Sequence, residues 1–335
     1  MPGLLTLRSD RLAVDLEPGR GGTIRQITLL AGSQRLLYEA GWEPQVAASA
    51  SSLSGEEWTA QYVGGWQTLV PNGGDECVVD GVRHGWHGES SVAAWTVLDA
   101  DSVSCRMECV LTTAPLRVER VIRVLGDRVL LCHTVTNIGA ADCTFMWAEH
   151  AAFGGDLLRA GAAIDSNATS ISIDPRHKTV GAAVDLGSRG TWPLLSSADG
   201  GVVDLREPGE GVSLLAYLGG FPEAAWASLT RQDGLGIVLV WGSAHHPHMW
   251  LWIETGGASG PPWSGRARVV GLEPASSLPA HGLAAIDDAQ RFRLRAGETA
   301  STDLTVHVAA EPGRVLHADH ESVVRAATAP PTTSA

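Results

Sequence analysis

Hydrophobic and polar residues alternate along many short segments of the chain, as they do in β-strands with one buried face. Residues 117–125 place Val118, Ile122 and Val124 on one face, although the alternation is interrupted midway. A Gly-Asp pair follows, and residues 128–135 form a second segment of the same kind. Two such segments joined by a glycine-containing turn predict a β-hairpin.

Three later segments also have the character of strands. Residues 303–308 alternate between Leu or Val on one face and Asp, Thr or His on the other, whereas residues 234–241 and 249–253 are apolar on both faces. The first pattern is typical of a half-buried strand, and the other two of strands buried on both sides. Strands do not alternate with long amphipathic helices, which argues against a parallel α/β sheet. We therefore predict an all-β protein, a large antiparallel β-sandwich with few short helices.

The ends of the chain and its loops complete this prediction. We expect one short helix within residues 315–328. Residues 48–55 are small and polar and predict a loop, and residues 326–335 form a low-complexity tail that we expect to be disordered. No linker-like segment divides the rest, so we predict a single domain over residues 1–325.

Composition narrows the range of partners. The formal net charge of −13 disfavours phosphate backbones, so we expect no nucleic-acid partner. Five cysteines without a Cys-x-x-Cys pair predict free thiols rather than a disulfide framework or a zinc knuckle. Charged residues interrupt the N-terminal segment, and no apolar stretch reaches the ~18 residues of a membrane span. We expect no signal peptide, no membrane association and a cytoplasmic location.

Residues 64–89 combine side chains that suit a sugar. Trp66, Gln67, Asn72 and His87 occur here among several glycines. An aromatic ring can stack on the apolar C–H face of a pyranose, while amide and imidazole groups hydrogen-bond its hydroxyls. Taken alone, however, the segment fits a turn-rich loop with one buried tryptophan better than a binding site.

Residues 144–155 carry Glu149 and His150 at the end of an otherwise apolar strand. Neighbours in a strand point to opposite faces, and burying either group without partners is unfavourable. His150 is therefore either a core histidine with satisfied hydrogen bonds, the commoner case for a lone histidine, or a general acid–base group.

Residues 267–282 place Glu273 beside small residues on one strand face, just before Pro274 ends the pairing. Glu273 is either a salt-bridged residue at a strand end or a catalytic carboxylate with room for a ligand. Three histidines lie within residues 245–248, but no carboxylate or cysteine stands at a recognisable ligand spacing from them. We predict no metal site, and we find no phosphate-binding or nucleophile-elbow motif.

In their order, these three segments resemble the galactose mutarotase (aldose 1-epimerase) superfamily. His87-Gly88 follows a Gly/Pro/Asn-rich stretch, as the family's sugar-binding His-Gly does. Residues 149–154 (EHAAFG) resemble its His-Pro-Tyr-Phe-Asn motif, and Leu-Glu at Glu273 resembles the motif of its catalytic base. Residues 18–37 and 296–298 resemble its opening hairpin and closing turn, so the resemblance extends over almost the whole chain.

The resemblance implies a twisted β-sandwich that interconverts the α and β anomers of a free hexose or related sugar. Glu273 would be the base for the anomeric hydroxyl, and His150 the acid for the ring oxygen. The residues implied to bind the sugar are His87, Trp66, Gln67, Asn72 and Trp252. The reaction needs no cofactor and no metal, the partner is a small sugar, and the protein is expected to be a monomer or a homodimer.

The chain also departs from the family pattern. Val63 and Gly64 stand where an arginine often binds the sugar, and Ala151-Ala152 replaces Pro-Tyr. Neither the aspartate that hydrogen-bonds galactose nor an arginine cluster for a phosphate is recognisable, so the sugar stays open. Two alternatives remain: a non-catalytic carbohydrate-binding or sensing module on the same fold and, with less support, a polysaccharide lyase. The lyase would need a base such as tyrosine, and the three tyrosines lie outside these motifs.

Overall fold

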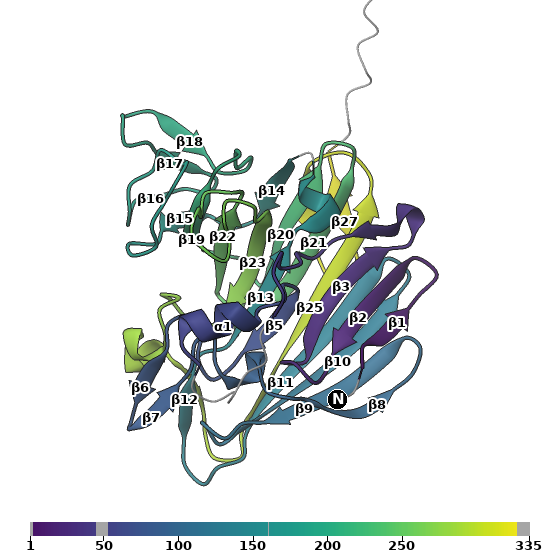
Figure 1. Ribbon diagram of the computed structural model, residues 1–335, viewed down its shortest axis with the longest axis vertical. Coiled ribbons are helices and arrows are strands. Elements are labelled where there is room, and N and C mark those ends of the chain that lie inside the picture. Colours follow the sequence, from purple (N-terminus) through teal and green to yellow (C-terminus); the bar gives the residue numbers. More distant parts are fainter. Residues whose placement is uncertain (1–2, 45–52, 160, 327–335) are drawn as a thin grey trace, which may run out of the picture.

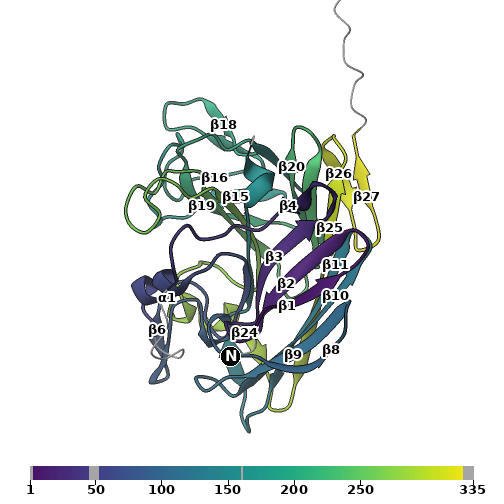
Figure 2. The ribbon, with the colours of Figure 1, turned by 45° about the vertical axis from the view of Figure 1, so that its right-hand side comes forward.

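The computed structural model describes residues 3–44, 53–159 and 161–326. Within this part of the chain, an 11-stranded and an 8-stranded antiparallel sheet lie face to face around a hydrophobic core (Figure 1 and Figure 2). In spatial order, the first sheet contains β1 (Leu5–Arg8), β2 (Leu12–Glu17), β3 (Thr23–Leu29), β5 (Trp66–Leu69), β13 (Ala148–Phe153), β23 (Val269–Ala275), β22 (His248–Glu254), β19 (Ser213–Gly219), β15 (Ser170–Ile173) and β16 (Arg189–Gly190), with β4 (Gln34–Arg35) paired to β3. The second contains β14 (Ala162–Ser166), β20 (Ala224–Arg231), β21 (Leu235–Gly242), β25 (Thr299–Ala310), β11 (Arg128–Asn137), β10 (Leu116–Leu125), β9 (Ser104–Val110) and β8 (Thr96–Ala100).

Smaller elements surround the two sheets. The two-stranded pairings are β6 (Cys77–Val79) with β7 (Val82–His84), β12 (Cys143–Phe145) with β24 (Phe292–Leu294), β17 (Leu194–Ser196) with β18 (Val202–Asp204), and β26 (Val315–Ala318) with β27 (Val323–Arg325). The helix α1 spans Gly55–Gln61, and short 3₁₀ turns occur at Ala31–Ser33, Glu89–Ser91, Gly155–Leu158, Leu283–Ala285 and Asp288–Gln290. In the described residues, no helix is long and apolar enough to cross a membrane.

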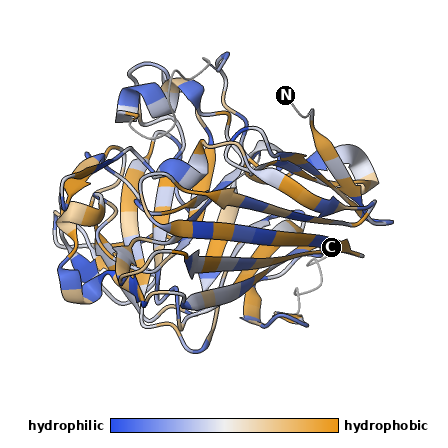
Figure 3. Ribbon diagram, turned by 90° about the horizontal axis from the view of Figure 1, so that it is seen from below, coloured by the Kyte–Doolittle hydropathy of each residue, from blue (hydrophilic) through white to orange (hydrophobic). Residues whose placement is uncertain are grey.

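The all-β class predicted from the sequence is confirmed, and strands occur where the alternation indicated them. The predicted hairpin is β10–β11, in which Val118 pairs with Val135 and Val124 with Val129. Buried and less buried residues alternate along both strands, and Figure 3 shows such alternation as hydrophobic and hydrophilic bands. The two segments that are apolar on both faces form β21 and β22, which are buried along almost their whole length.

The C-terminal part of the chain corrects one prediction. Residues 315–326 form the β26–β27 hairpin instead of a helix. The Asp319 carboxylate closes the turn by accepting hydrogen bonds from the backbone N–H groups of Glu321 and Ser322. Such bonds between a side chain and the backbone compete with helix formation. Val315 packs against Trp226 on the outer face of the second sheet, so burial favours the hairpin. The rest of the predicted tail, residues 327–335, lies outside the described residues, as does most of the predicted loop at 48–55.

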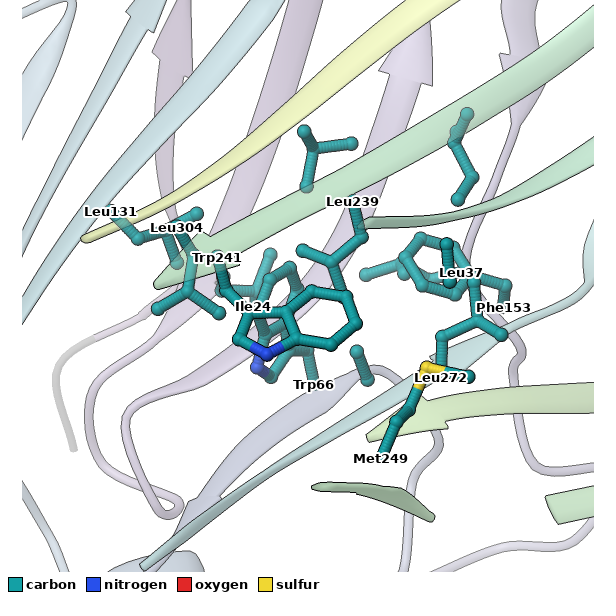
Figure 4. Close-up of a cluster of buried hydrophobic side chains, with 14 of the residues drawn as sticks. Ile24, Leu37, Trp66, Leu131, Phe153, Leu239, Trp241, Met249, Leu272 and Leu304 are labelled. Carbon is teal, nitrogen blue, oxygen red and sulfur yellow. The ribbon is translucent and has the colours of Figure 1, made fainter. Parts of the chain in front are cut away.

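Large apolar side chains from both sheets fill the core between them. Trp66 and Phe153 from the first sheet, and Leu239 and Trp241 from the second, are fully buried, and Figure 4 shows them in one cluster. Burying one such side chain is worth about 1.5–3 kcal/mol. The core therefore holds β5 and β13 in a fixed position against the second sheet.

Strand β13 also places a carboxylate in this core. Glu149 is fully buried and accepts hydrogen bonds from Trp66 Nε1 at 2.9 Å, Thr68 Oγ1 at 3.0 Å and His133 Nδ1 at 2.5 Å. Arg120, buried as well, donates to the Thr68 hydroxyl. Burial alone would raise the pKa of Glu149, but His133 and Arg120 outweigh it and hold that pKa below its ordinary value. Glu149 is thus an ionised, fully partnered carboxylate behind the strand.

Candidate active site

The neighbouring strands β13 and β23 bring His150 and Glu273 together. In their antiparallel register Ala152 pairs with Gly271, and two residues along each strand His150 stands opposite Glu273. The distance between His150 Nε2 and Glu273 Oε1 is 3.8 Å, and both side chains are almost fully buried. Because side chains alternate along a strand, both lie on the face of the sheet opposite to Glu149.

Gly271 creates the space that the Glu273 carboxylate occupies. A Cβ at this position would lie 2.3 Å from Glu273 Oε1 and 3.2 Å from the Cβ of Trp252. Any larger residue would therefore displace the carboxylate. The small residue that the sequence places beside Glu273 is part of how the site is built.

A loop after β7 carries His87 to the same place. The backbone of His87 is left-handed, with φ of 57°, which is uncommon for a residue with a side chain. The backbone N–H of Gly74 donates to His87 Nδ1 at 3.0 Å. A neutral imidazole that accepts at Nδ1 carries its proton on Nε2. The ring centroids of His87 and His150 are 5.0 Å apart. The Nε2–H group of His87 is therefore a hydrogen-bond donor next to His150 and Glu273.

Aromatic rings surround these histidines. Trp58 of α1 and Tyr62, the residue that follows this helix, meet the His150 ring edge-on, with centroids 5.7 Å and 5.6 Å away. Trp252 of β22 lies 5.9 Å from the same ring and in turn contacts Trp263 edge-on at 5.4 Å. These rings restrict the access of water to His150 and offer apolar faces on which a pyranose can stack.

Together these residues line a pocket of about 290 Å³ on the open face of the first sheet. This volume lies near the lower end of the ~300–1,000 Å³ range of small-molecule sites. The aromatic lining residues are Trp58, Tyr62, Trp86, Trp250, Trp252 and Trp263. No lysine or arginine occurs among the lining residues that the structure describes.

Burial sets the proton affinities of the central pair. It raises the pKa of Glu273 well above the ordinary value of 4.5 and lowers the pKa of His150 to about 4. The pKa of His87 is also well below its ordinary value, first through burial and then through the neighbouring His150. Burial therefore favours the uncharged form of each group, a protonated carboxyl group and a neutral imidazole.

Four of the residues that the resemblance implied line this pocket together: Glu273, His150, His87 and Trp252. Trp66 does not, which corrects its assignment to the sugar-binding wall. Side chains alternate along β5, so Trp66 points into the core, where its indole donates to Glu149. Gln67 pairs with His150 and shares its face, but it lies beneath α1 in a separate small cavity and donates to the Gly64 carbonyl.

Asn72 is also outside the pocket lining, and its contacts are structural. Its amide donates to the carbonyl groups of Asp75 and Gly85, and its Oδ1 accepts the backbone N–H of Leu283 at 2.7 Å. The side chain is fully buried. Asn72 therefore joins three loops at the rim of the pocket and holds the loop of His87 in place.

The sequence analysis missed Trp58 of α1 and Tyr62, which directly follows the helix. The Ser54-x-x-Glu57 sequence at its start forms a capping box in the structure, and that signature could have located the helix. The Tyr62 hydroxyl is buried and has no hydrogen-bond partner among the described residues. A tyrosine does therefore stand at the site, contrary to expectation. A lyase site would in addition need groups that neutralise a uronate, and the described lining contains no cationic Lys or Arg.

The glycine that replaces the family's arginine is explained by the backbone. Gly64 has φ of 81°, and a Cβ at this position would lie 2.1 Å from the carbonyl oxygen of Tyr38. An arginine at this position is incompatible with the close approach of these two segments.

Comparison with solved structures identifies the fold. The chain superposes on a candidate aldose 1-epimerase from Escherichia coli K12 with a TM-score of 0.63 and 18% identity, covering 91% of this chain and 98% of that one. A candidate aldose 1-epimerase from Klebsiella pneumoniae gives a TM-score of 0.65 at 16% identity, covering 91% and 79%. A galactose mutarotase related enzyme from Lactobacillus acidophilus gives 0.62 at 13% identity, covering 96% and 100%. No family model matches the chain, and no curated protein matches its sequence. The protein thus has the galactose mutarotase-like fold.

Proposed function

We propose that this protein is an aldose 1-epimerase that interconverts the α and β anomers of a free sugar. The observation that carries the proposal is the buried pair of His150 and Glu273, 3.8 Å apart, within an aromatic pocket. Buried titratable groups with opposite pKa shifts are typical of acid–base sites. The fold, shared with candidate aldose 1-epimerases, supports the same function.

The pair first has to reach its reactive form. In the free pocket burial disfavours the charged form of both groups and so favours a proton on Glu273 and a neutral His150. Sugar hydroxyls that donate to the carboxylate would favour its ionised form. The proton then moves to His150, which gives a carboxylate base beside an imidazolium acid without any change in the number of protons.

Mutarotation breaks one C–O bond and re-forms it on the other face of the carbonyl carbon. Glu273 removes the proton of the anomeric hydroxyl while the bond from C1 to the ring oxygen breaks, and His150 delivers its proton to that oxygen. The open-chain aldehyde rotates about its C1–C2 bond. The reverse proton transfers then close the ring, so the pair ends with the proton count with which it began and no cofactor is consumed.

The surrounding residues hold the sugar between these groups. His87 can donate from Nε2, because Gly74 occupies its Nδ1. Trp252 and Trp263 offer ring faces to the apolar side of a pyranose. Exclusion of water by these rings strengthens each hydrogen bond to the sugar.

The test is a mutarotation assay on a panel of free aldoses, followed by polarimetry and by NMR of the anomeric protons. We expect the protein to accelerate the approach to anomeric equilibrium in proportion to its concentration for at least one sugar. His317→Ala, a change at an exposed histidine of β26, serves as the variant with unaltered activity. If sugars bind but their anomers exchange only at the spontaneous rate, the protein is a binding module and the proposal is wrong.

A further inference from the structure

A second polar cluster lines the same pocket, contributed by loops that are far apart in the sequence. Its centre is Asp174, which directly follows β15 and is fully buried. Asp174 accepts hydrogen bonds from the Tyr217 hydroxyl, from the backbone N–H of Arg176 at 2.8 Å and from His281 Nε2 at 2.8 Å. These bonds outweigh burial and hold the pKa of Asp174 well below its ordinary value. A carboxylate therefore fixes the orientation of the His281 ring.

The other nitrogen of His281 is available to a ligand. The side chain of His281 is only 9% exposed, and its Nδ1 has no hydrogen-bond partner among the described residues. Since Nε2–H donates to Asp174, Nδ1 of the neutral ring is an acceptor. It lies 3.5 Å from Asp75 Oδ2, and both residues line the pocket. These two atoms thus stand side by side, and Nδ1 of His281 has no donor among the described residues.

The remaining contacts make this corner rigid and negative. Arg176 holds Asp75 from outside the pocket, with Nη2 2.9 Å from Oδ2. Glu254, a further lining carboxylate, accepts the backbone N–H groups of Gly256 and Ala258. The described lining contains carboxyl groups and no lysine or arginine, so it offers an anionic ligand no cationic Lys or Arg partner.

We propose that His281 and Asp75 form a recognition subsite for a hydrogen-bond donor of the sugar, a hydroxyl or an ammonium group remote from the reacting carbon. The pocket accordingly takes neutral or amino sugars and rejects uronic acids and phosphorylated sugars. That the ligand is a sugar rests on the proposed function. The class of sugar follows from the acceptors and carboxylates of this subsite.

The test measures binding directly, through the intrinsic fluorescence of the pocket tryptophans. Two series are titrated: glucose, glucosamine, glucuronate and glucose 6-phosphate, and the same four derivatives of galactose. We expect the neutral and amino members of at least one series to bind at least about tenfold more tightly than the acidic and phosphorylated members. Equal or tighter binding of the acidic members, or no binding by any member, overturns the proposal.

Two variants examine the residues themselves. His281→Ala should weaken the neutral sugar about tenfold, since it removes one buried hydrogen bond. Asp75→Asn keeps an acceptor without its charge, so it should retain the neutral sugar and lose affinity for the amino sugar. Thermal unfolding monitors the fold of both variants. If the fold is intact and both affinities are unchanged, the subsite is contradicted.

The outcome separates this inference from the proposed function. Selective binding without anomeric exchange would leave the subsite in place and remove the epimerase activity. Anomeric exchange that persists in His281→Ala with an unchanged KM would leave the activity in place and remove the subsite.

Discussion

Strand β13 carries buried titratable residues on both of its faces, and their surroundings are opposite in kind. On the core face, Glu149 accepts hydrogen bonds from Trp66, Thr68 and His133, and its pKa is lowered. On the pocket face, His150 Nδ1 has no hydrogen-bond partner in the described part of the chain, and His150 Nε2 lies 3.8 Å from Glu273 Oε1. The pKa of Glu273 is raised by burial alone.

The difference between these two carboxyl groups separates a structural role from a functional one. A buried carboxylate whose donors are all supplied by the protein stabilises the fold that supplies them. A buried carboxyl group without donors destabilises the free protein and is explained by a ligand that brings the missing hydrogen bonds. Glu149 belongs to the first kind, and we assign Glu273 to the second.

The largest expected effect concerns the pocket face. His150→Ala removes the group assigned as the acid, and we expect kcat/KM for anomeric exchange to fall by ~10²–10⁴. The fold should persist, because His150 makes no hydrogen bond through Nδ1. The rate is measured by NMR exchange of the anomeric protons beside a thermal unfolding curve. A rate close to that of the wild type would remove His150 from the mechanism.

On the core face the same kind of change should affect stability instead. Glu149→Ala leaves His133 and the Trp66 indole buried without their acceptor and removes the negative charge near the buried Arg120, and we expect the free energy of unfolding to fall by about 3–5 kcal/mol. Urea unfolding measures it, with the exposed Glu321→Ala as the matched control, for which a change within about 0.5 kcal/mol is expected. Equal effects of the two substitutions would contradict the structural role of Glu149.

A smaller effect is expected from the residue that makes room for Glu273. The Cβ of Gly271→Ala would meet Glu273 Oε1 at 2.3 Å, so the carboxylate must move, and we expect activity to fall at least about tenfold. Overpacking of this kind costs about 1–3 kcal/mol of stability. Gly260→Ala is the control, since nothing lies within 4 Å of a Cβ there. A loss of activity that is fully explained by the loss of stability would contradict a specific displacement of Glu273.

The smallest effect is a pH dependence of stability. The folded protein keeps a proton on Glu273 that the unfolded chain releases above a pKa of about 4.5, so this group's contribution to the free energy of unfolding declines as pH rises. Glu273→Gln has no titrating carboxyl group at this position, so its free energy of unfolding does not decline with pH for this reason. Its stability relative to the wild type should therefore increase as pH rises from about 4.5 towards the raised pKa of the folded state, by up to ~1.4 kcal/mol per pH unit.

The histidine of the pair acts in the opposite sense. The pKa of His150 falls to about 4 on folding from an ordinary 6.5, so its contribution to stability is lost as pH falls through that interval. The two groups partly offset each other in the wild type, and the difference between wild type and Glu273→Gln isolates the carboxyl group. Urea unfolding at a series of pH values measures it, and a difference that is independent of pH would show that Glu273 is ionised in the free protein.

Much of the fold could be predicted from the sequence because strands with one buried face reveal themselves by alternation. The β10–β11 hairpin is an example, and the opposite faces of Glu149 and His150 are another. Alternation does not say which face is the core. The resemblance assigned both Trp66 and Gln67 to sugar binding. Neighbouring residues in a strand point to opposite faces of the sheet, and in the structure the Trp66 side chain lies in the hydrophobic core.

The parts that could not be predicted depend on tertiary structure. Asp75, Asp174 and His281 meet only because three loops converge at one end of the first sheet, and no spacing in the sequence records that. The terminal β26–β27 hairpin is favoured by burial against Trp226, a residue distant in the chain. By contrast, α1 carried a capping-box signature and could have been found.

The central claim is that Glu273 and His150 are acid–base machinery, and Glu273→Gln tests it most directly, because the amide has the size of the carboxyl group but cannot accept the proton. The rate of anomeric exchange and the affinity for the same sugar are measured in parallel on wild type and variant. We expect the rate to fall by ~10²–10⁴ while the affinity stays close to that of the wild type and the melting temperature does not fall. A variant that exchanges anomers at the rate of the wild type would contradict the claim.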